Sequence, residues 1–306
     1  MEFPITGVVI NPLLLAGIGF IVGILGGFFG VGGGFLAGPF MLWSGVPANF
    51  VVGTDLAHMT GKSMVALRRH RIFGHVDTKL GLLMIIGTMV GVEAGAQMIE
   101  LLEDSGSIDQ VIGTTYIVIL LAISAFTAFE SIRSIRALRN QTEDDERVGV
   151  TEVLGFQGMA RRVQNIRIPP MISLPASGIE SISLWSILIV GFISGLLAGF
   201  LGVGGGFIRM PLFIYVLGVP THVAVGTDLF EIIFSAGFGT FTHALKGNVD
   251  ILMALVMQTG AALGAQIGAT ATNFFAGPRI RLLFSILPLI GATLVILSLL
   301  GIGGAH

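Results

Sequence analysis

Long apolar runs separated by short polar stretches dominate this chain. In each half, a run interrupted by glycines is followed by further apolar segments, and most runs approach the ~20 residues that an α-helix needs to cross ~30 Å of hydrocarbon. The runs lack the ~10-residue alternation of a membrane β-strand. Because lipid cannot satisfy backbone polar groups, the pattern predicts an all-α integral membrane protein of about eight hydrophobic helices. The unbroken segments are residues 47–67, 78–102, 111–132, 220–245, 250–275 and 280–300.

Composition supports lipid as the main solvent. Hydrophobic residues make up 53% of the 306 residues and charged residues 11%, and the mean hydropathy is +0.91. An average soluble domain is roughly 25% charged, so a water-soluble fold is excluded. The absence of cysteine excludes disulfides and thiolate chemistry, and no basic patch indicates nucleic-acid binding. No Lys or Arg precedes the run at Leu13, so we expect that run to be retained as a helix rather than cleaved as a signal peptide.

The chain contains the same unit twice. GILGGFFGVGGGFLAGPF, starting at Gly23, returns as GLLAGFLGVGGGFIRMPL from Gly195, and GVPANFVVGTDL at 45–56 returns as GVPTHVAVGTDL at 218–229. A fixed order of self-similar blocks of this kind indicates internal duplication. We therefore predict a first transmembrane repeat at 1–132, a polar cytoplasmic linker at 133–183 and a second transmembrane repeat at 184–306.

Loop charges bear on how the two copies face the membrane. Arg68, Arg69 and Lys79 lie near one end of the segment 47–67, and further arginines lie in the linker, so the positive-inside rule places both regions in the cytoplasm. If each glycine-broken segment crosses completely, the copies are parallel and Arg279 and Arg281 lie outside. If each broken segment enters and returns as a re-entrant hairpin, the copies are inverted and these arginines lie inside. The charges favour the inverted arrangement.

The glycine runs at the two breaks are the first candidate site. Each interior glycine costs roughly 1 kcal/mol against alanine in a helix, so a run of them favours a break whose freed amides and half-helix N-terminus face a ligand, preferably an anion. Close helix packing is the alternative, and it explains the spaced glycines at 87, 91 and 95 and at 260, 264 and 268 better. The candidate ligand-facing residues are Gly30, Gly32, Gly33, Gly34, Gly202, Gly204, Gly205 and Gly206.

A Gly-Thr-Asp triplet follows each break. It brings Asp55 and Asp228 to the start of an apolar helix, where a carboxylate either caps the helix or binds a proton or coupling cation. The neighbouring hydroxyls of Thr54 and Thr227 are candidate ligands for the solute.

Among the other polar residues, some differ between the two copies and some occur in both. Arg209 stands where the first copy has Ala37, and an intramembrane arginine beside a break would attract a sulfonate or carboxylate. His70 and His243 occupy equivalent helix ends, which suits either a proton relay or a solvated role. His58 and Glu231 also occupy matching positions, so the copies have diverged there.

The doubled pattern resembles a known family. G-x-x-G-x-G-G-G with Pro beyond it, then G-V-P and V-G-T, spans 27–53 and again 199–226. In this the chain resembles the TauE/SafE family, bacterial membrane proteins implicated in export of sulfite and organosulfonates. The resemblance covers both halves and leaves out chiefly the linker. It implies multi-pass location in the cell membrane and anion transport; the anion and its sulfur come from the resemblance alone.

The leading hypothesis is therefore a secondary transporter, not an enzyme, that exports a small sulfur-containing anion. An intramembrane aspartyl hydrolase with Asp55 and Asp228 as its dyad is the alternative from the enzyme class, and an ion channel is another. Expected partners are the lipid bilayer, a small anionic solute and a coupling ion, H⁺ or Na⁺, with no nucleic acid, metal or cofactor. The oligomeric state is left open, a homo-oligomer included.

Overall fold

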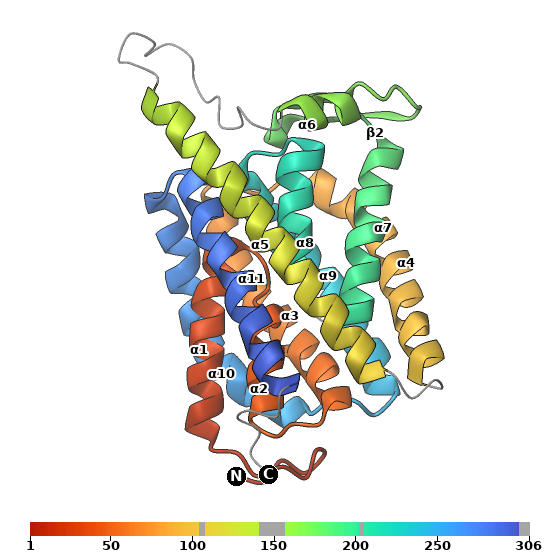
Figure 1. Cartoon of the computed structure of the whole chain (residues 1–306), viewed down its shortest axis with the longest axis vertical. Helices are drawn as coiled ribbons and strands as arrows, with labels where there is room; N and C mark the ends of the chain where they lie inside the picture. The colour runs from red at the N-terminus through yellow and green to blue at the C-terminus, as the bar shows by residue number, and fades with distance from the viewer. Residues whose placement is uncertain (104–107, 141–156, 202–204, 300–306) are drawn as a thin grey trace.

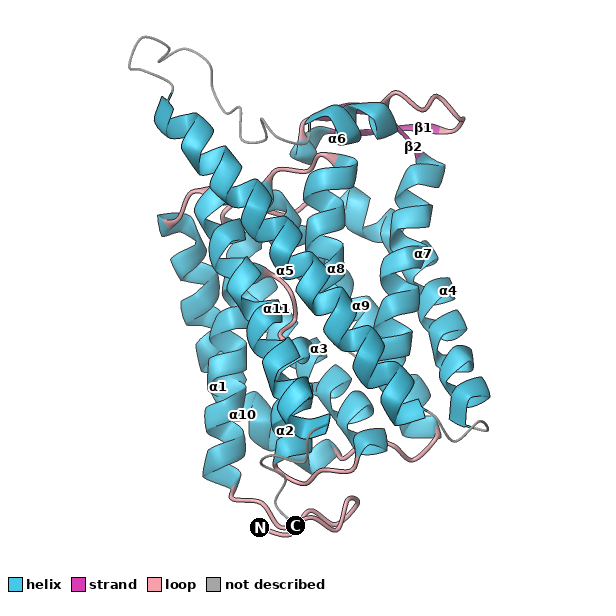
Figure 2. Ribbon diagram, in the orientation of Figure 1, coloured by secondary structure: helices cyan, strands magenta, loops and turns pink. Residues whose placement is uncertain are grey.

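The computed structural model describes residues 1–103, 108–140, 157–201 and 205–299, and it is a bundle of long helices (Figures 1 and 2). The predicted all-α membrane class is confirmed. The first copy contains α1 (Pro12–Phe29), α2 (Gly34–Trp43), α3 (Ala48–Ile72), α4 (Thr78–Glu103) and α5 (Ile108–Asn140). The second contains α7 (Leu184–Leu201), α8 (Gly206–Pro211), a π-helical segment (Leu212–Leu217), α9 (Thr221–Leu245), α10 (Ile251–Ala271) and α11 (Gly277–Leu299).

Short elements lie between the copies. They are α6 (Gln157–Gln164), the antiparallel strands β1 (Met171–Leu174) and β2 (Ile179–Ser183), and a 3₁₀ turn (Pro175–Ser177) that joins the strands. Figure 1 shows α6 and β2 at one end of the bundle, here called the linker end, and the N-terminus at the other, here called the N-terminal end. Helix α5 continues to Asn140, beyond the linker boundary at 132/133 that apolar content alone predicts.

Helices of one copy pack on helices of the other. Helix α1 lies against α10, α4 against α7, α3 against α9 and α5 against α11. Gly53 near the start of α3 touches Asn248 just beyond α9, and Gly226 near the start of α9 touches His75 just beyond α3. The corresponding helices α3 and α9 therefore run in opposite directions, which is the geometry of an inverted repeat.

Glycine permits the closest of these contacts. A Cβ at any of the spaced glycines would overlap a backbone carbonyl oxygen of the facing helix: Gly87, Gly91 and Gly95 of α4 face α7, and Gly260, Gly264 and Gly268 of α10 face α1. Without side chains at these positions the two backbones come into direct contact, which gains dispersion energy that lipid cannot supply. The contacts agree with the packing interpretation of these six residues.

Each glycine break turns the chain back on itself. A Cβ on Gly33 would lie 2.9 Å from the carbonyl oxygen of Val22 in α1, and one on Gly38 would lie 3.6 Å from Val51 early in α3. Helix α2 thus returns toward the end of the bundle from which α1 came. In the second copy, Gly205 similarly lies against Ser194 of α7. Each copy therefore consists of a re-entrant hairpin followed by three long helices, an odd number of crossings that inverts the second copy relative to the first.

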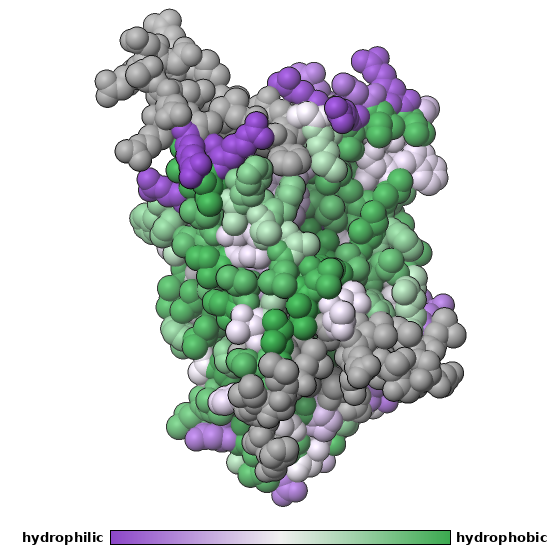
Figure 3. Space-filling model, viewed as in Figure 1, coloured by the Kyte–Doolittle hydropathy of each residue, from purple (hydrophilic) through white to green (hydrophobic). Residues whose placement is uncertain are grey.

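The surface divides into an apolar band and polar ends. Among the described residues, five helices are long and apolar enough to cross a membrane: α1, the first part of α4, a central part of α5, α9 and α10. Figure 3 shows apolar residues across the middle of the visible face, with hydrophilic residues concentrated toward its two ends. This distribution matches a hydrocarbon layer across the long axis.

The helices α5 and α11 cross side by side on the face toward the viewer in Figure 1. The Ser124 hydroxyl donates to the Ser285 carbonyl at 2.6 Å, and Arg281 pairs with Glu130 at 3.3 Å, with both side chains buried. Contacts that advance along one helix while they retreat along the other show that this pair is antiparallel. It is the second pair of corresponding helices with opposite directions.

Candidate functional site

The two re-entrant turns meet at the middle of the bundle. A Cβ at Gly206 would lie 2.6 Å from the carbonyl oxygen of Val31, and Gly32 contacts Met59 and Ile232, the central residues of α3 and α9. Gly30 ends α1 and lies against the backbone of α9 at Val225. Because the described turn residues of each copy lie against the other copy, this non-helical backbone is shielded from lipid.

The predicted glycines have distinct places in these turns. Gly33 and Gly205 have φ of 73° and 69°, a left-handed conformation that side chains disfavour. Gly34 and Gly206 then begin the returning helices α2 and α8. Gly202 and Gly204 lie outside the described residues. Backbone at the start of α2 exposes unpaired N–H groups and the positive end of a helix dipole toward the centre of the bundle.

Arg209 of α8 is the centre of a buried charge cluster, hereafter the arginine cluster. Its Nη1 lies 2.7 Å from Oδ1 of Asp228 and also pairs with Glu231, one helical turn further along α9, and all three side chains are 0% exposed. Its Nε donates to the Ser194 hydroxyl at 3.4 Å. The Ser235 hydroxyl donates to Glu231 at 3.1 Å. Two carboxylates thus share one guanidinium, and Nη2 of Arg209 has no hydrogen-bond partner among the described residues.

A second cluster lies along α3 and is hereafter the lysine cluster. Oδ1 of Asp55 lies 3.3 Å from Nδ1 of His58, and Lys62 follows on the same helix; the three side chains are 1% exposed or less. The Nζ of Lys62, Oδ2 of Asp55 and Nε2 of His58 have no hydrogen-bond partner in the described part of the chain. Helix α3 starts at Ala48, so Asp55 lies inside it and is not a helix cap. The same holds for Asp228 in α9, which starts at Thr221.

Lys62 is the central residue that sequence reasoning missed. Its signal was nevertheless in the sequence: an ionisable residue inside an apolar segment is expensive and is by default a candidate functional residue. The proximity of the arginine run at 68–71 made it look like part of the polar end of the helix, whereas it lies in the bundle centre beside Gly26 and Gly33.

The two threonines of the Gly-Thr-Asp triplets connect the copies. The Thr54 hydroxyl accepts the Asp250 N–H at 3.0 Å, and the Thr227 hydroxyl accepts the Asp77 N–H at 2.8 Å. The two aspartates in turn accept the N–H of the third residue after them, at the starts of α10 and α4. Each threonine therefore connects the first part of its own helix, α3 or α9, to the start of a helix of the other copy, α10 or α4. A ligand role for either threonine stays a prediction.

The paired histidines lie at equivalent places. Nε2 of His70 lies 3.0 Å from the carbonyl oxygen of Gly27, which the end of α1 leaves free for such a contact, and the ring is fully buried. His75, just beyond α3, stacks near His70 and near His222, with ring centroids 5.8 and 5.1 Å apart. Burial, and secondarily the charge of His222, lowers the pKa of His75 below its ordinary value.

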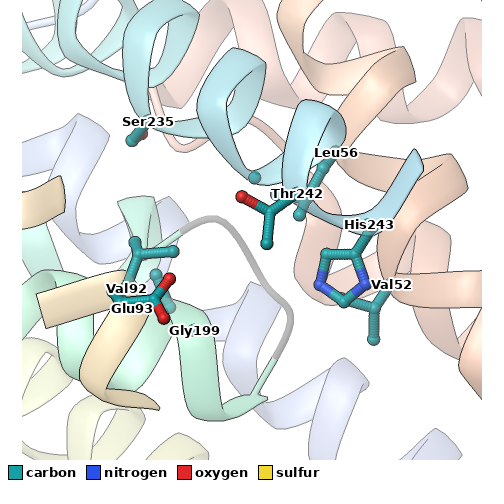
Figure 4. A pocket seen from close by; sticks show the side chains of 10 residues that line it. Val52, Leu56, Val92, Glu93, Gly199, Ser235, Thr242 and His243 are labelled. Carbon is teal, nitrogen blue, oxygen red and sulfur yellow. The ribbon is translucent and has the colours of Figure 1, made fainter. Parts of the chain in front are cut away.

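His243 lines a small cleft of about 20 Å³ between α3, α4, α7 and α9. In Figure 4, Thr242 and His243 lie on one side of this cleft, with Val92 and Glu93 on the other. Ser235 also lines it, so the cleft reaches the Ser235 hydroxyl that donates to Glu231 of the arginine cluster. The cleft lining is therefore one hydrogen bond from the buried charges.

A second cleft of about 470 Å³ lies between α3 and α10. It is lined by Met64, Val65, Arg68, Arg69, Ile72 and Gln266. Under the repeat correspondence that pairs Gly91 with Gly264 and His70 with His243, Gln266 matches Glu93 and Arg69 matches Thr242. The two clefts thus share two corresponding lining positions, although the rest of their linings differ. Because the copies are inverted, one lies toward the linker end and the other toward the N-terminal end.

Comparisons with known proteins find relatives described as probable membrane transporters. The chain is 26% identical to the probable membrane transporter protein YunE of Bacillus subtilis (strain 168) over 292 residues, covering 92% of this chain and 97% of the relative. It is 23% identical to the probable membrane transporter protein MJ0441 of Methanocaldococcus jannaschii over 289 residues, covering 90% and 91%.

A plant relative matches over a shorter stretch. The sulfite exporter TauE/SafE family protein 3 of Arabidopsis thaliana is 33% identical over 116 residues, which cover 37% of this chain and 23% of that protein. No solved structure matches the chain significantly. The family model for the sulfite exporter TauE/SafE matches residues 15–305, so the chain belongs to the TauE/SafE family and is a multi-pass membrane transporter.

Proposed function

We propose that this protein is a secondary transporter of the cell membrane that exports a small sulfur-containing anion, such as sulfite or an organosulfonate. The observation that carries the proposal is the meeting of two glycine turns at the bundle centre, with the buried cation Lys62 beside the first turn and no hydrogen-bond or ion-pair partner for it among the described residues. Buried cations next to unpaired backbone N–H groups favour an anion over a cation or a neutral solute.

The inverted repeats supply a route for alternating access. One cleft lies toward each end of the bundle, and the turns and both charge clusters lie between them. Rocking the unit that contains α1 and α10 against the unit that contains α4 and α7 would exchange which cleft reaches the centre. The glycine contacts of α1 with α10 and of α4 with α7 join the copies closely, so each of these pairs is expected to move as one body.

The direction in the membrane follows from charge. At the linker end lie Arg68, Arg69, Arg71, Lys79, Arg133, Arg136, Arg161, Arg162, Arg167 and Arg279. The positive-inside rule therefore orients the linker end toward the cytoplasm. Export then loads the anion from the cleft lined by Arg68 and Arg69, whose positive charge attracts it, and releases it through the cleft lined by Glu93, whose charge repels it.

The arginine cluster is the best candidate for ion coupling. With Arg209, Asp228 and Glu231 all ionised it holds one negative charge in excess, and one carboxylate oxygen of each acid has no hydrogen-bond partner among the described residues. A proton bound there restores neutrality in a region of low dielectric, which makes H⁺ the favoured coupling ion. Asp55 with His58, and His70 and His243 at the helix ends, are further stations for the proton.

The aspartyl hydrolase alternative is less well supported. Catalysis by a dyad needs two carboxylates that share one proton at contact distance. Asp55 faces His58, whereas Asp228 faces Arg209, so each has its own basic partner. The geometry favours separate roles for the two aspartates.

Flux through proteoliposomes tests the proposal. The purified chain is reconstituted and loaded separately with sulfite, sulfoacetate, chloride and Na⁺, and efflux is followed with and without an imposed pH gradient. We expect efflux of at least one sulfur anion well above that of empty liposomes and sensitivity to the proton gradient. Rapid movement of Na⁺ with no movement of any anion would overturn it.

A further inference from the structure

Lys62 presents an ammonium group that the protein itself does not neutralise. Its side chain is 1% exposed, and its Nζ has no hydrogen-bond or ion-pair partner among the described residues. Asp55 is the acid whose charge acts on Lys62. The two residues are seven positions apart on α3, which is ~10 Å along the helix axis, and Oδ1 of Asp55 contacts His58 instead. A buried, unpaired ammonium is expensive in a bilayer interior, which requires a compensating role.

The ammonium lies against the first re-entrant turn. A Cβ at Gly33 would lie 3.1 Å from Nζ, and one at Gly26 would lie 3.6 Å from Cε. Gly34 next begins α2, whose first N–H groups have no helical partner. The cation and the unpaired amides of one turn therefore occupy the same small region, and both favour negative charge.

The second turn has a cation at the equivalent place, but it comes from a different helix. A Cβ at Gly205 would lie 3.2 Å from Nη2 of Arg209, which belongs to α8, whereas Lys62 belongs to α3. In the repeat correspondence Lys62 matches Ser235 and Arg209 matches Ala37. Both copies thus place a cation beside the glycine turn, although the two cations come from positions that do not correspond in the repeat.

The two cations differ in charge balance. Arg209 is bound by two carboxylates, so an incoming anion would meet net negative charge at the second turn. Lys62 has no such carboxylate in contact within the part of the chain that the structure describes. We infer that the anion binds at the first turn, on Nζ of Lys62 and the backbone at Gly33 and Gly34, and that Arg209 serves the neighbouring arginine cluster instead of holding the anion.

The ligand class follows from this geometry. One ammonium and one helix start suit a compact oxyanion head with one or two negative charges, such as a sulfite or the sulfonate group of a small organosulfonate. Gly33 is tight against Val22 as well as Nζ, which leaves no room for a side chain and brings the anion close to backbone. This assignment rests on the proposed anion transport and names the residue that confers it.

Substitution of Lys62 by methionine tests the inference. Methionine keeps the length and flexibility of the side chain and removes the charge, so a lysine that exists only to hold an anion should be dispensable for folding. In detergent, sulfite or ethanesulfonate should raise the melting temperature of the wild type, with chloride at equal ionic strength as the reference. We expect K62M to melt at or above the ligand-free wild type and to lose the anion-dependent rise.

Controls separate this inference from the proposed function. Lys246, exposed in the loop after α9, provides the matched variant K246M, which should keep the anion response. K62R, which keeps a cation, should retain part of it, with binding weakened less than in K62M. In proteoliposomes K62M should raise the KM for the anion at least tenfold.

Each other outcome is decisive. If K62M keeps the anion-dependent melting shift, or transports with an unchanged KM, the anion does not bind Lys62 although the proposed function stands. If K62M fails to fold, Lys62 is structural and the inference is overturned. If the wild type neither responds to nor transports any anion, the proposed function itself fails.

Discussion

Removal of the Arg209 guanidinium should destabilise the protein strongly, and the geometry sets the size of the effect. The change Arg209→Met leaves Asp228 and Glu231 buried, one turn apart on α9 and without a cation. Breaking a buried ion pair by removing one partner costs about 3–5 kcal/mol. Repulsion between the two remaining carboxylates acts in the same direction.

The loss can be read as a melting temperature. In domains of a few hundred residues each kcal/mol shifts the midpoint by roughly 2–4 °C, so R209M should melt about 6–20 °C below the wild type. The assay is thermal denaturation in detergent followed by size-exclusion chromatography of the fraction that remains monodisperse.

A compensated variant identifies the cause. In R209M/D228N/E231Q the guanidinium and both acids are gone, so no charge is left unpaired and most of the lost stability should return. Neutral replacement of a whole buried ionic group is often tolerated where removal of one member is not. The reasoning is refuted if R209M melts within about 2 °C of the wild type, or if the triple variant melts no higher than R209M.

Other parts of the structure give further expectations. Gly264→Leu inserts a side chain where α10 touches the backbone of α1 and should abolish recovery of monodisperse protein, whereas Gly17→Leu on the open face of α1 should not; equal recovery would contradict the packing argument. Glu231→Gln removes the surplus negative charge of the arginine cluster and should make anion flux independent of an imposed pH gradient. The control is Glu180→Gln at the exposed linker end, and persistent gradient dependence in the Glu231 variant would exclude Glu231 as the proton site. His75 has a folded-state pKa below its ordinary value, so the unfolded chain binds more protons and stability should fall as pH drops below about 6.5. His75→Asn should flatten the dependence of the melting temperature on pH between about pH 7 and pH 5. An unchanged dependence would mean that other groups cause it.

The helical membrane class was predictable because it depends on quantities that are local in sequence. Apolar runs near the length of a bilayer crossing require helices whatever their neighbours are. The duplication is also visible in one dimension, and the alternation of basic residues between loops favoured inversion. The structure adds how the inversion arises, because the chain reverses direction at each glycine run. From the sequence alone, a glycine-broken segment could either return as a hairpin or cross the membrane completely.

The polar residues were harder to assign, and Asp55 and Thr54 show why. Both belong to one short motif, yet Thr54 contacts a helix start of the other copy while Asp55 points to His58 in the lysine cluster. Adjacent helical residues face directions about 100° apart, so one motif serves two different surroundings. Sequence matching between the copies identified the positions and could not say which faces the centre.

Sequence alone determined that the chain is a duplicated helical membrane protein, because hydrophobic length and self-similarity are properties of the chain itself. Only the tertiary structure decided which charges are neutralised. Arg209 pairs with two acids on α9, and Lys62 pairs with none of the described acids, although both are single cations in apolar segments. Pairing depends on which helices pack together. Because an unpaired charge in lipid is costly, a paired cation is a structural charge, whereas an unpaired cation indicates a ligand-binding role.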